Sequence, residues 1–377
     1  MALGLYFHIP FCDTKCTYCD FLSFEHRNCD EIEIYTKYLL KEITLYKETI
    51  KDRCVDSIYF GGGTPSLLSE KNIYDLMSAI YESFNVSDDS ENTIEINPYN
   101  LKDTYFKNLA NSKINRASVG LETSNESLLR KLNRNTTLQQ FLHTIDSLKK
   151  YGINNISADL ILGLPDNTIS QELSDAEILI NNDIKHISAY SLILHENTKL
   201  YNDIKNGRFN LPTEENERKS YHAFSDFVQA NGFKRYEISS FARAGYESRH
   251  NKKYWSLEDY LAFGIGASAF YNGERRKNFS NLKYYYEALD KNELPYRVEY
   301  VLSENDYKSE YAFLNIRTSH GINTEEFEKR FKQNFFDVFN IRKHIDSGLL
   351  LYENGKLTLT KKGIDLSNLV EVDFILD

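Results

Sequence analysis

Short apolar runs alternate, over the first half of the chain, with longer segments in which apolar residues recur at helical spacing. The short runs are rich in β-branched and aromatic residues, so we expect them to be strands separated by amphipathic helices. Strand and helix in repeated alternation predict a parallel sheet covered by helices. The expected strands are 3–9, 55–60, 93–96, 116–121, 156–162 and 186–192, and the expected helices are 30–49, 70–84, 101–110, 138–151 and 169–181.

These six expected strands predict an α/β fold in the form of a partial, TIM-like (β/α)6 barrel. Distinctive residues follow several of the strands: cysteines follow the first, a glycine-rich turn at 61–65 follows the second, and Gly-Leu-Pro at 163–165 follows the fifth. Loops at the C-terminal ends of barrel strands carry the functional site in such folds. We therefore expect the site at this end of the sheet.

The alternation gives way, after about residue 234, to aromatic and glycine-containing segments such as 260–270, which we expect to pack on the barrel. From residue 305 the pattern turns helical and ends with two short apolar runs on either side of Asn354 and Gly355. This order predicts a small winged-helix-like α+β domain, whose mixed charge gives no support for DNA binding. The expected units are a barrel core over 1–235, an extension over 236–304 and the C-terminal domain over 305–377.

The chain of 377 residues carries a formal net charge of −10 and has a pI of about 5.5. No basic stripe is visible, so a nucleic-acid surface is not expected. No apolar run approaches the ~20 residues that span a bilayer, which predicts a soluble protein with at most peripheral membrane contact. Cysteines without disulfide partners belong in a reducing compartment, so we expect a cytoplasmic location.

Three cysteines, Cys12, Cys16 and Cys19, follow the first expected strand with the spacing C-x3-C-x2-C. Thiolates are soft ligands for iron, and a [4Fe-4S] cube normally takes four of them, so three on one loop leave one iron without a protein ligand. A structural zinc site would need a fourth ligand at matching spacing, which the chain lacks. The spacing therefore favours a cluster over zinc or structural thiols. Cys29 and Cys54 have no partner at such spacing and are expected to be ordinary thiols.

The turn Gly61-Gly62-Gly63-Thr64-Pro65 follows the second expected strand. Consecutive glycines let backbone groups approach a ligand closely. The turn matches neither the phosphate loop nor the dinucleotide fingerprint, and by itself it fits a plain β-to-α turn equally well. Its position one strand after the cysteine loop favours a ligand site.

The cysteine loop, the glycine turn and the phrases Asp-Leu-Ile-Leu-Gly-Leu-Pro at 159–165 and His-Ile-Ser-Ala-Tyr at 186–190 resemble the oxygen-independent coproporphyrinogen III oxidase-like family of radical S-adenosylmethionine proteins. The resemblance covers nearly the whole chain. It implies a radical SAM barrel and a [4Fe-4S] cluster whose free iron is chelated by the amino and carboxylate groups of S-adenosylmethionine. Reduction through such a cluster can cleave the sulfonium to a 5′-deoxyadenosyl radical, a reactivity that the cofactor supplies and the protein directs.

The same resemblance implies S-adenosylmethionine contacts at matching positions. A sulfonium ligand with an amino-acid end offers a cation for Glu95, a carboxylate for Arg134 and hydroxyls for Asp159. The ordinary alternatives are that Glu95 and Asp159 cap helices and that Arg134 is a surface cation. Where relatives carry Gly-x-Gln, this chain has Glu122, which places an anion among the expected contacts. These are Tyr6 and Tyr18 near the cluster and adenine, Gly62, Gly63 and Thr64 at the amino end, and Glu95, Glu122, Arg134 and Asp159 around the methionine and ribose.

Two features separate this chain from the oxidases of the family. The oxidases carry a further cysteine two residues after the last cluster ligand, where this chain has Phe21. They also carry a long N-terminal extension, whereas only eleven residues precede Cys12 here. The resemblance therefore favours the branch of haem chaperones, which bind haem and pass it to haemoproteins such as respiratory enzymes.

The phrase that distinguishes the chaperone branch is His-Asn-x-x-Tyr-Trp, and here it spans 250–255 directly after Arg249. Imidazole is a common axial ligand of haem iron, so the resemblance implies that His250 binds haem, with Arg249 near a propionate. The alternative is a hydrogen-bonded loop histidine beside buried aromatics. Relatives commonly have cysteine where this chain has Ser248, so attachment of haem through a thiol at this position is excluded. Many relatives have histidine where this chain has Ser268, so the haem iron must use His250 or a ligand from outside the chain.

The leading hypothesis is a haem chaperone with a [4Fe-4S] cluster and S-adenosylmethionine. One alternative is a radical SAM oxidoreductase that acts on a porphyrinogen, and another is a non-catalytic protein with a vestigial site, so enzymatic activity is left open. The expected partners are haem, acceptor haemoproteins and a reductant protein such as flavodoxin or ferredoxin.

Overall fold

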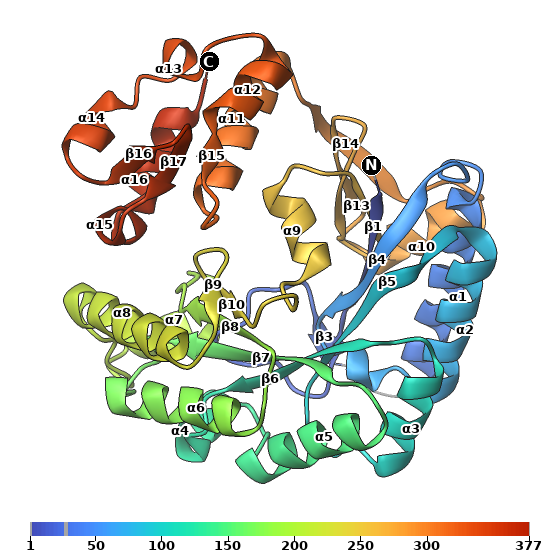
Figure 1. Cartoon of the computed structure of the whole chain (residues 1–377). Coiled ribbons are helices and arrows are strands. Elements are labelled where there is room, and N and C mark those ends of the chain that lie inside the picture. The colour runs from blue at the N-terminus through green and yellow to red at the C-terminus, as the bar shows by residue number, and fades with distance from the viewer. Residues whose placement is uncertain (1, 26–28, 377) are drawn as a thin grey trace.

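Six parallel strands form the centre of the molecule (Figure 1). The computed structural model describes residues 2–25 and 29–376. The strands pair in the order in which they follow one another, which confirms the expected parallel sheet. They are β1 (Leu3–Ile9), β4 (Cys54–Gly62), β5 (Asn85–Ile96), β6 (Arg116–Glu122), β7 (Asn155–Leu162) and β8 (His186–Ser191).

Successive residues of β1 face opposite sides of the sheet, as the period of a strand requires. Leu5 and Phe7 belong to the main apolar core, and the Phe7 ring stacks between Phe60 and Phe263 with centroid distances of 4.9 and 4.5 Å. Tyr6 points to the concave side, where its ring stacks on Tyr59. The convex side is therefore apolar and the concave side polar.

The convex face is covered by helices (Figure 1). All five predicted amphipathic segments form helices, whereas the helix over 214–230 and two short helices were not predicted. Most of these helices begin at a residue whose side chain caps the N-terminus, such as Ser69 and Thr168. In the fifth helix, Thr137 and Gln140 form a capping box, and the core side buries Phe141, Ile145 and Leu148. These helices are α1 (Cys29–Tyr46), α2 (Glu70–Ser83), α3 (Asp103–Asn111), α5 (Leu138–Lys150), α6 (Ile169–Asn181) and α8 (Glu214–Ala230), with short α4 (Glu126–Lys131) and α7 (Lys199–Lys205) beside them.

The segment after the barrel extends the same sheet instead of packing on it, which differs from the expectation for 260–270. Strand β11 (Tyr260–Phe263) pairs in parallel with the free edge of β1, where unpaired backbone groups need partners. The sheet then continues antiparallel through β12 (Ser268–Tyr271), β13 (Glu274–Asn278) and β14 (Tyr296–Val301), next to α10 (Leu282–Asp290). At the other edge, β10 (Ser240–Ala242) and β9 (Lys234–Arg235) follow β8, and α9 (Arg249–Trp255) lies on the concave side.

The C-terminal segment has its own apolar core, in which Phe327, Phe335 and Phe339 pack together. Asn354 and Gly355 both have positive φ, as the predicted hairpin turn requires. The helical pattern expected from residue 305 onward is divided among four helices, of which the last two before the hairpin are short. The elements are α11 (Glu304–Ile316), β15 (Ile322–Asn323), α12 (Thr324–Phe331), α13 (Phe335–Val338), α14 (Arg342–Asp346), β16 (Leu350–Glu353), β17 (Lys356–Leu359), α15 (Lys361–Asp365) and α16 (Ser367–Glu371). No helix among the described residues has the length and apolarity to cross a membrane.

Candidate functional site

A cavity of about 490 Å³ opens at the C-terminal ends of the parallel strands, where the sequence predicts the site. It brings together all three cysteines of the predicted cluster loop and most of the predicted cofactor contacts. Tyr6 and His250 are the two predicted site residues that do not line it. The predicted residues that do are Cys12, Cys16, Tyr18, Cys19, Gly62, Gly63, Thr64, Glu95, Glu122, Arg134 and Asp159.

Backbone hydrogen bonds hold the cysteine loop against the glycine turn. The amides of Gly63 and Thr64 donate to the carbonyls of Ile9 and Phe11, at 2.8 and 2.7 Å. Within the loop, Thr17 donates to the carbonyl of Leu132 at the end of α4. Two motifs more than forty residues apart in the sequence are thus fixed to one another by main-chain contacts.

The thiols of the loop lie in a partly buried, polar setting. Burial raises the pKa of the Cys12 thiol, although hydrogen bonds from Thr64 and Ser23 act in the opposite direction. Burial likewise raises the pKa of Cys19 to about 11. Among the described residues, no three His, Cys, Asp or Glu side chains converge on a point where a single metal ion would fit. A cubane cluster does not need such convergence, because each thiolate binds a different iron.

The glycine turn has no room for side chains. Gly62 has a φ of +114°, and a Cβ atom there would lie 2.5 Å from Nδ1 of His8. A Cβ atom on Gly63 would lie 2.7 Å from the carbonyl oxygen of Phe11 and 3.1 Å from Sγ of Cys12. The exposed backbone of the turn therefore forms a wall of the cavity that a ligand can approach closely.

Glu95 and Asp159 are held on neighbouring walls of the cavity. Glu95 accepts hydrogen bonds from the Tyr59 hydroxyl at 2.9 Å and from the Gly62 amide at 3.1 Å. Asp159 accepts from the Ser118 hydroxyl at 3.1 Å. Burial, reinforced by the neighbouring Asp159 charge, raises the pKa of Glu95 to about 7, and burial also raises the pKa of Asp159. Both carboxyls face the cavity, so neither is the helix cap that the ordinary interpretation suggested.

Arg134 is buried rather than a surface cation, with a side chain only 10% exposed. Its Nη2 atom donates to the Gly120 carbonyl at 3.1 Å and lies 3.2 Å from Oε1 of Glu122, while Nη1 donates to Sγ of Cys16 at 3.9 Å. Its Nε atom is buried without a hydrogen-bond partner among the described residues. Burial raises the pKa of Glu122 to about 7 even though Arg134 acts to lower it.

The lining fits S-adenosylmethionine in charge and in the hydrogen-bonding groups that it offers. Three buried carboxyl groups, from Glu95, Glu122 and Asp159, line the same cavity as the guanidinium of Arg134. A ligand that brings a sulfonium and an ammonium group together with one carboxylate adds net positive charge to such a lining. The glycine turn offers backbone groups, and the buried Nε of Arg134 offers a donor in need of a partner.

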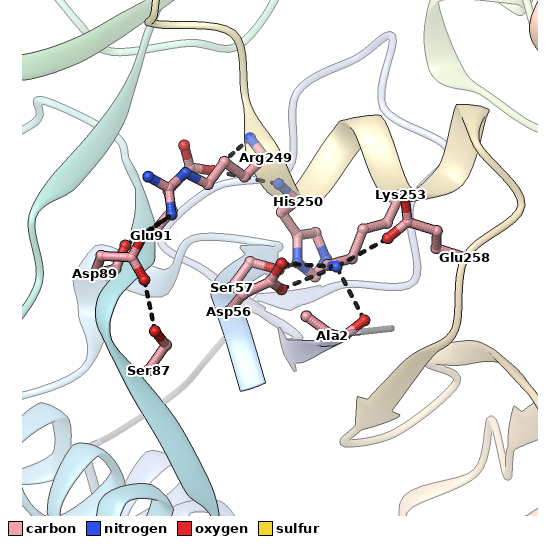
Figure 2. A network of polar contacts seen from close by, with 10 residues as sticks. All are labelled: Ala2, Asp56, Ser57, Ser87, Asp89, Glu91, Arg249, His250, Lys253 and Glu258. Carbon is pink, nitrogen blue, oxygen red and sulfur yellow. Dashed lines mark hydrogen bonds and ion pairs between the residues drawn. The ribbon is translucent and has the colours of Figure 1, made fainter. Parts of the chain in front are cut away.

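The predicted haem phrase forms α9, whose first turn is held at the strands by Glu91 (Figure 2). The Glu91 carboxylate accepts from the backbone amides of Arg249 and His250, at 2.9 and 3.3 Å. Figure 2 also shows Lys253, which contacts the carboxylates of Asp56 and Glu258. This network fixes the helix on the concave side of the sheet.

His250 is completely buried, and both ring nitrogens have hydroxyl partners. Nδ1 lies 3.1 Å from Oγ of Ser57 and Nε2 lies 2.8 Å from the hydroxyl of Tyr254. Burial first, and then the nearby charges of Lys253 and Arg116, lower the pKa of His250 to about 3. Haem ligation by His250 stays a prediction, and it requires that Ser57 or Tyr254 first release the ring.

Tyr6 lies between His250 and the cavity. Its hydroxyl contacts Nδ1 of His8 at 3.1 Å, and its ring packs against Tyr59 and His250 with centroid distances of 6.2 and 6.4 Å. Tyr59 itself lines the cavity. Tyr6 therefore packs behind Tyr59 and supports this wall of the cavity.

Sequence reasoning missed several residues of the cavity. Tyr59 and Ser118, which hold Glu95 and Asp159, stand two positions before Gly61 and Gly120 on their strands. The alternation of a strand puts residues two apart on one face, so this signal was present in the sequence. Tyr190 ends the phrase 186–190 but was given no contact in the site, and His195, after the end of β8, belongs to no motif.

Comparisons with known proteins agree with this geometry. Residues 6–177 match the model of the radical SAM superfamily, and residues 302–366 match that of the HemN C-terminal domain. The heme chaperone HemW of Lactococcus lactis subsp. lactis (strain IL1403) is 36% identical over 375 residues, which are 99% of this chain and 97% of the relative. The heme chaperone HemW of Bacillus subtilis (strain 168) is 33% identical over 368 residues, 96% of each chain.

A solved structure shows the same fold. Coproporphyrinogen III oxidase (HemN) from Escherichia coli, a radical SAM enzyme, superposes with a TM-score of 0.87 over 99% of this chain and 90% of that chain, at 20% identity. The barrel, its extension and the C-terminal domain thus occur together in a protein of distant sequence. With relatives more than 30% identical along almost their whole length, this chain belongs to the HemW family of radical SAM proteins.

Proposed function

We propose that this protein is a haem chaperone, which binds haem and transfers it to acceptor haemoproteins. The observation that carries the proposal is the identity of 36% and 33% to two heme chaperones over nearly the whole chain. The shared layout extends from the cysteine loop to the C-terminal domain, so the similarity is not restricted to a common cofactor module.

Membership of the radical SAM superfamily implies a [4Fe-4S] cluster and S-adenosylmethionine. When bound, the cluster supplies an electron for reductive cleavage of the sulfonium. Cys12, Cys16 and Cys19 would hold three of its irons. We propose that Arg134 binds the carboxylate of S-adenosylmethionine and that Glu95 binds its cationic amino end.

The remaining contacts follow from the positions of the other lining residues. Gly62, Gly63 and Thr64 would present backbone groups to the amino-acid end, and Asp159 would bind the ribose hydroxyls. Tyr18, whose hydroxyl is buried near Cys16 and Glu122, would contact the cluster and the adenine. Glu122 sets the charge that Arg134 presents to the ligand.

Phe21 supports a chaperone over a porphyrinogen oxidase. It stands where the sequence resemblance places a further cysteine in the oxidases, and its side chain is 63% exposed at the mouth of the cavity. An apolar ring cannot supply the thiol of the oxidases. We therefore expect no turnover of coproporphyrinogen III.

We further propose a cytoplasmic location, a reductant protein such as flavodoxin or ferredoxin as electron donor, and respiratory haemoproteins among the acceptors. The absence of a basic stripe on this acidic chain gives no support for a nucleic-acid partner.

The test is direct haem transfer. Anaerobically reconstituted protein loaded with haem is mixed with a haem-depleted respiratory enzyme, and recovery of the acceptor's activity is compared with the rate at which haem escapes to excess apomyoglobin. We expect transfer to the acceptor to exceed that escape rate. Equal rates would contradict the proposal, and transfer by Cys16→Ala at the wild-type rate would indicate a vestigial cluster site.

A further inference from the structure

Three buried histidines are closed to haem iron in this structure. An imidazole ligates iron through a ring nitrogen that keeps its lone pair. His8 contacts the Tyr6 hydroxyl and the Leu22 carbonyl, and His186 contacts the hydroxyls of Ser157 and Tyr236. His250 is engaged in the same way.

His195 differs from them, because it is the one histidine of the described residues that lines the cavity. It lies in the loop between β8 and α7, and its side chain is 41% exposed. Its position is fixed by Thr198, whose backbone amide and hydroxyl both donate to the His195 carbonyl. An exposed imidazole therefore stands at the mouth of the cavity on a defined turn.

A carboxylate lies beside this imidazole. Nε2 of His195 lies 3.2 Å from Oδ2 of Asp20, the residue that follows Cys19. The nearby Asp20 charge favours the tautomer with the proton on Nε2, which leaves Nδ1 the lone pair that a metal ion needs. No described residue provides Nδ1 with a hydrogen-bond partner.

The same mouth carries unusually exposed apolar side chains. Phe21, Tyr190 and Ile193 are 63%, 46% and 70% exposed, and all three line the cavity. Exposed apolar groups that gather around a polar site mark a binding surface. Lys15 lies at the same mouth and contributes a cation, with its ammonium group bonded to the Phe21 carbonyl.

We infer that haem docks on this mouth, with its iron bound by His195, its macrocycle against Phe21 and Ile193, and a propionate near Lys15. The inference rests on the proposed function, because it takes haem as the ligand. Haem matches the surface in its flat apolar face, its need for an imidazole and its anionic edge. Haem bound there covers the cavity for the cluster and the nucleotide. In this arrangement His195 binds the iron, and His250 holds α9 in place.

The experiment titrates iron(III) protoporphyrin IX into the anaerobically reconstituted protein and follows the Soret band. His195→Ala should weaken haem binding at least tenfold and abolish the Soret shift of imidazole ligation. The matched control is His143→Ala, which removes another half-exposed histidine beside an aspartate, 3.9 Å from Asp103 and away from the cavity. It should bind haem like the wild type.

Metal-free protoporphyrin IX separates the iron ligand from the apolar wall. It should bind His195→Ala like the wild type, whereas Phe21→Ser should weaken binding of both haem and the metal-free macrocycle. If His195→Ala binds haem with wild-type affinity and Soret position, or if only His250→Gln loses them, the inference is overturned. The chaperone proposal would still stand in either case. A wild-type protein that binds no haem would overturn the chaperone proposal itself. Circular dichroism on each variant confirms that the fold is intact.

Discussion

Nη2 of Arg134 lies 3.2 Å from Oε1 of Glu122, and the two side chains are only 10% and 13% exposed. The guanidinium that we assign to the carboxylate of S-adenosylmethionine is therefore already paired with a carboxylate of the protein. Glu122 also has a φ of +62°, a conformation that is costly for a residue with a side chain, and sits at a β-bulge next to Gly120. When the nucleotide binds, its carboxylate must either share Arg134 with Glu122 or replace Glu122 as the partner of Arg134.

Glu122→Gln should tighten binding of S-adenosylmethionine, because a neutral amide no longer competes for Arg134. A gain of about 1 kcal/mol, roughly fivefold in Kd, is the scale of one charge-assisted hydrogen bond. Isothermal titration calorimetry on cluster-loaded protein measures it. Glu126→Gln, which removes a carboxylate from an exposed pair with Arg130, is the control. Weaker binding by Glu122→Gln would instead indicate that Glu122 contacts the nucleotide as an anion.

Gly62→Ala should abolish nucleotide binding, because its Cβ atom would enter the space of the His8 ring while φ stays positive. Gly152→Ala is a matched control, since Gly152 has a φ of +91° but no neighbouring atom within 4 Å of the place that a Cβ atom would occupy. The control should lose only about 1 kcal/mol of stability and keep its affinity for S-adenosylmethionine. Equal affinities of the two variants would show that the turn does not shape the site.

Acid should destabilise the protein through His250. The folded-state pKa is lowered from 6.5 to about 3, chiefly by burial, so the unfolded chain binds more protons below pH 6.5. The contribution of the neutral His250 ring to the free energy of unfolding is complete above pH 6.5 and decreases as the pH falls towards 3. Between pH 6.5 and 5 this corresponds to a loss of about 2 kcal/mol in the free energy of unfolding.

His250→Gln removes the titrating group and keeps a polar side chain beside Ser57 and Tyr254. Urea unfolding of anaerobic wild-type and variant samples should show a shallower dependence on pH in the variant over this interval. Parallel pH profiles would contradict the assignment of a buried, neutral imidazole.

The positions of the cluster loop and glycine turn could be predicted because both follow parallel strands, whose C-terminal ends meet at one edge of a sheet. The pairings inside the cavity could not. Arg134 with Glu122 and Tyr59 with Glu95 depend on strand register and side-chain rotamers, which leave no sequence pattern. The haem phrase likewise does not show that both nitrogens of His250 are already engaged.

The extension was harder to predict for a different reason. Strand β11 pairs with β1, although more than two hundred and fifty residues separate Gly4 from Tyr260. Strand β13 reads Glu-Arg-Arg-Lys-Asn and has no apolar alternation, and the first residues of β5 are polar as well. Such strands are specified by their non-local partners rather than by local pattern.

Iron and sulfide analysis together with electron paramagnetic resonance tests the central claim most directly. Anaerobically reconstituted protein should contain about four irons and four sulfides per chain. Its reduced spectrum should change when S-adenosylmethionine is added. Cys54→Ala, which alters an exposed free thiol, should keep the cluster, and Cys16→Ala should lose it. The account would be contradicted by a wild-type protein that is colourless or that holds zinc at these cysteines. It would also be contradicted by a cluster spectrum that does not change when the nucleotide is added.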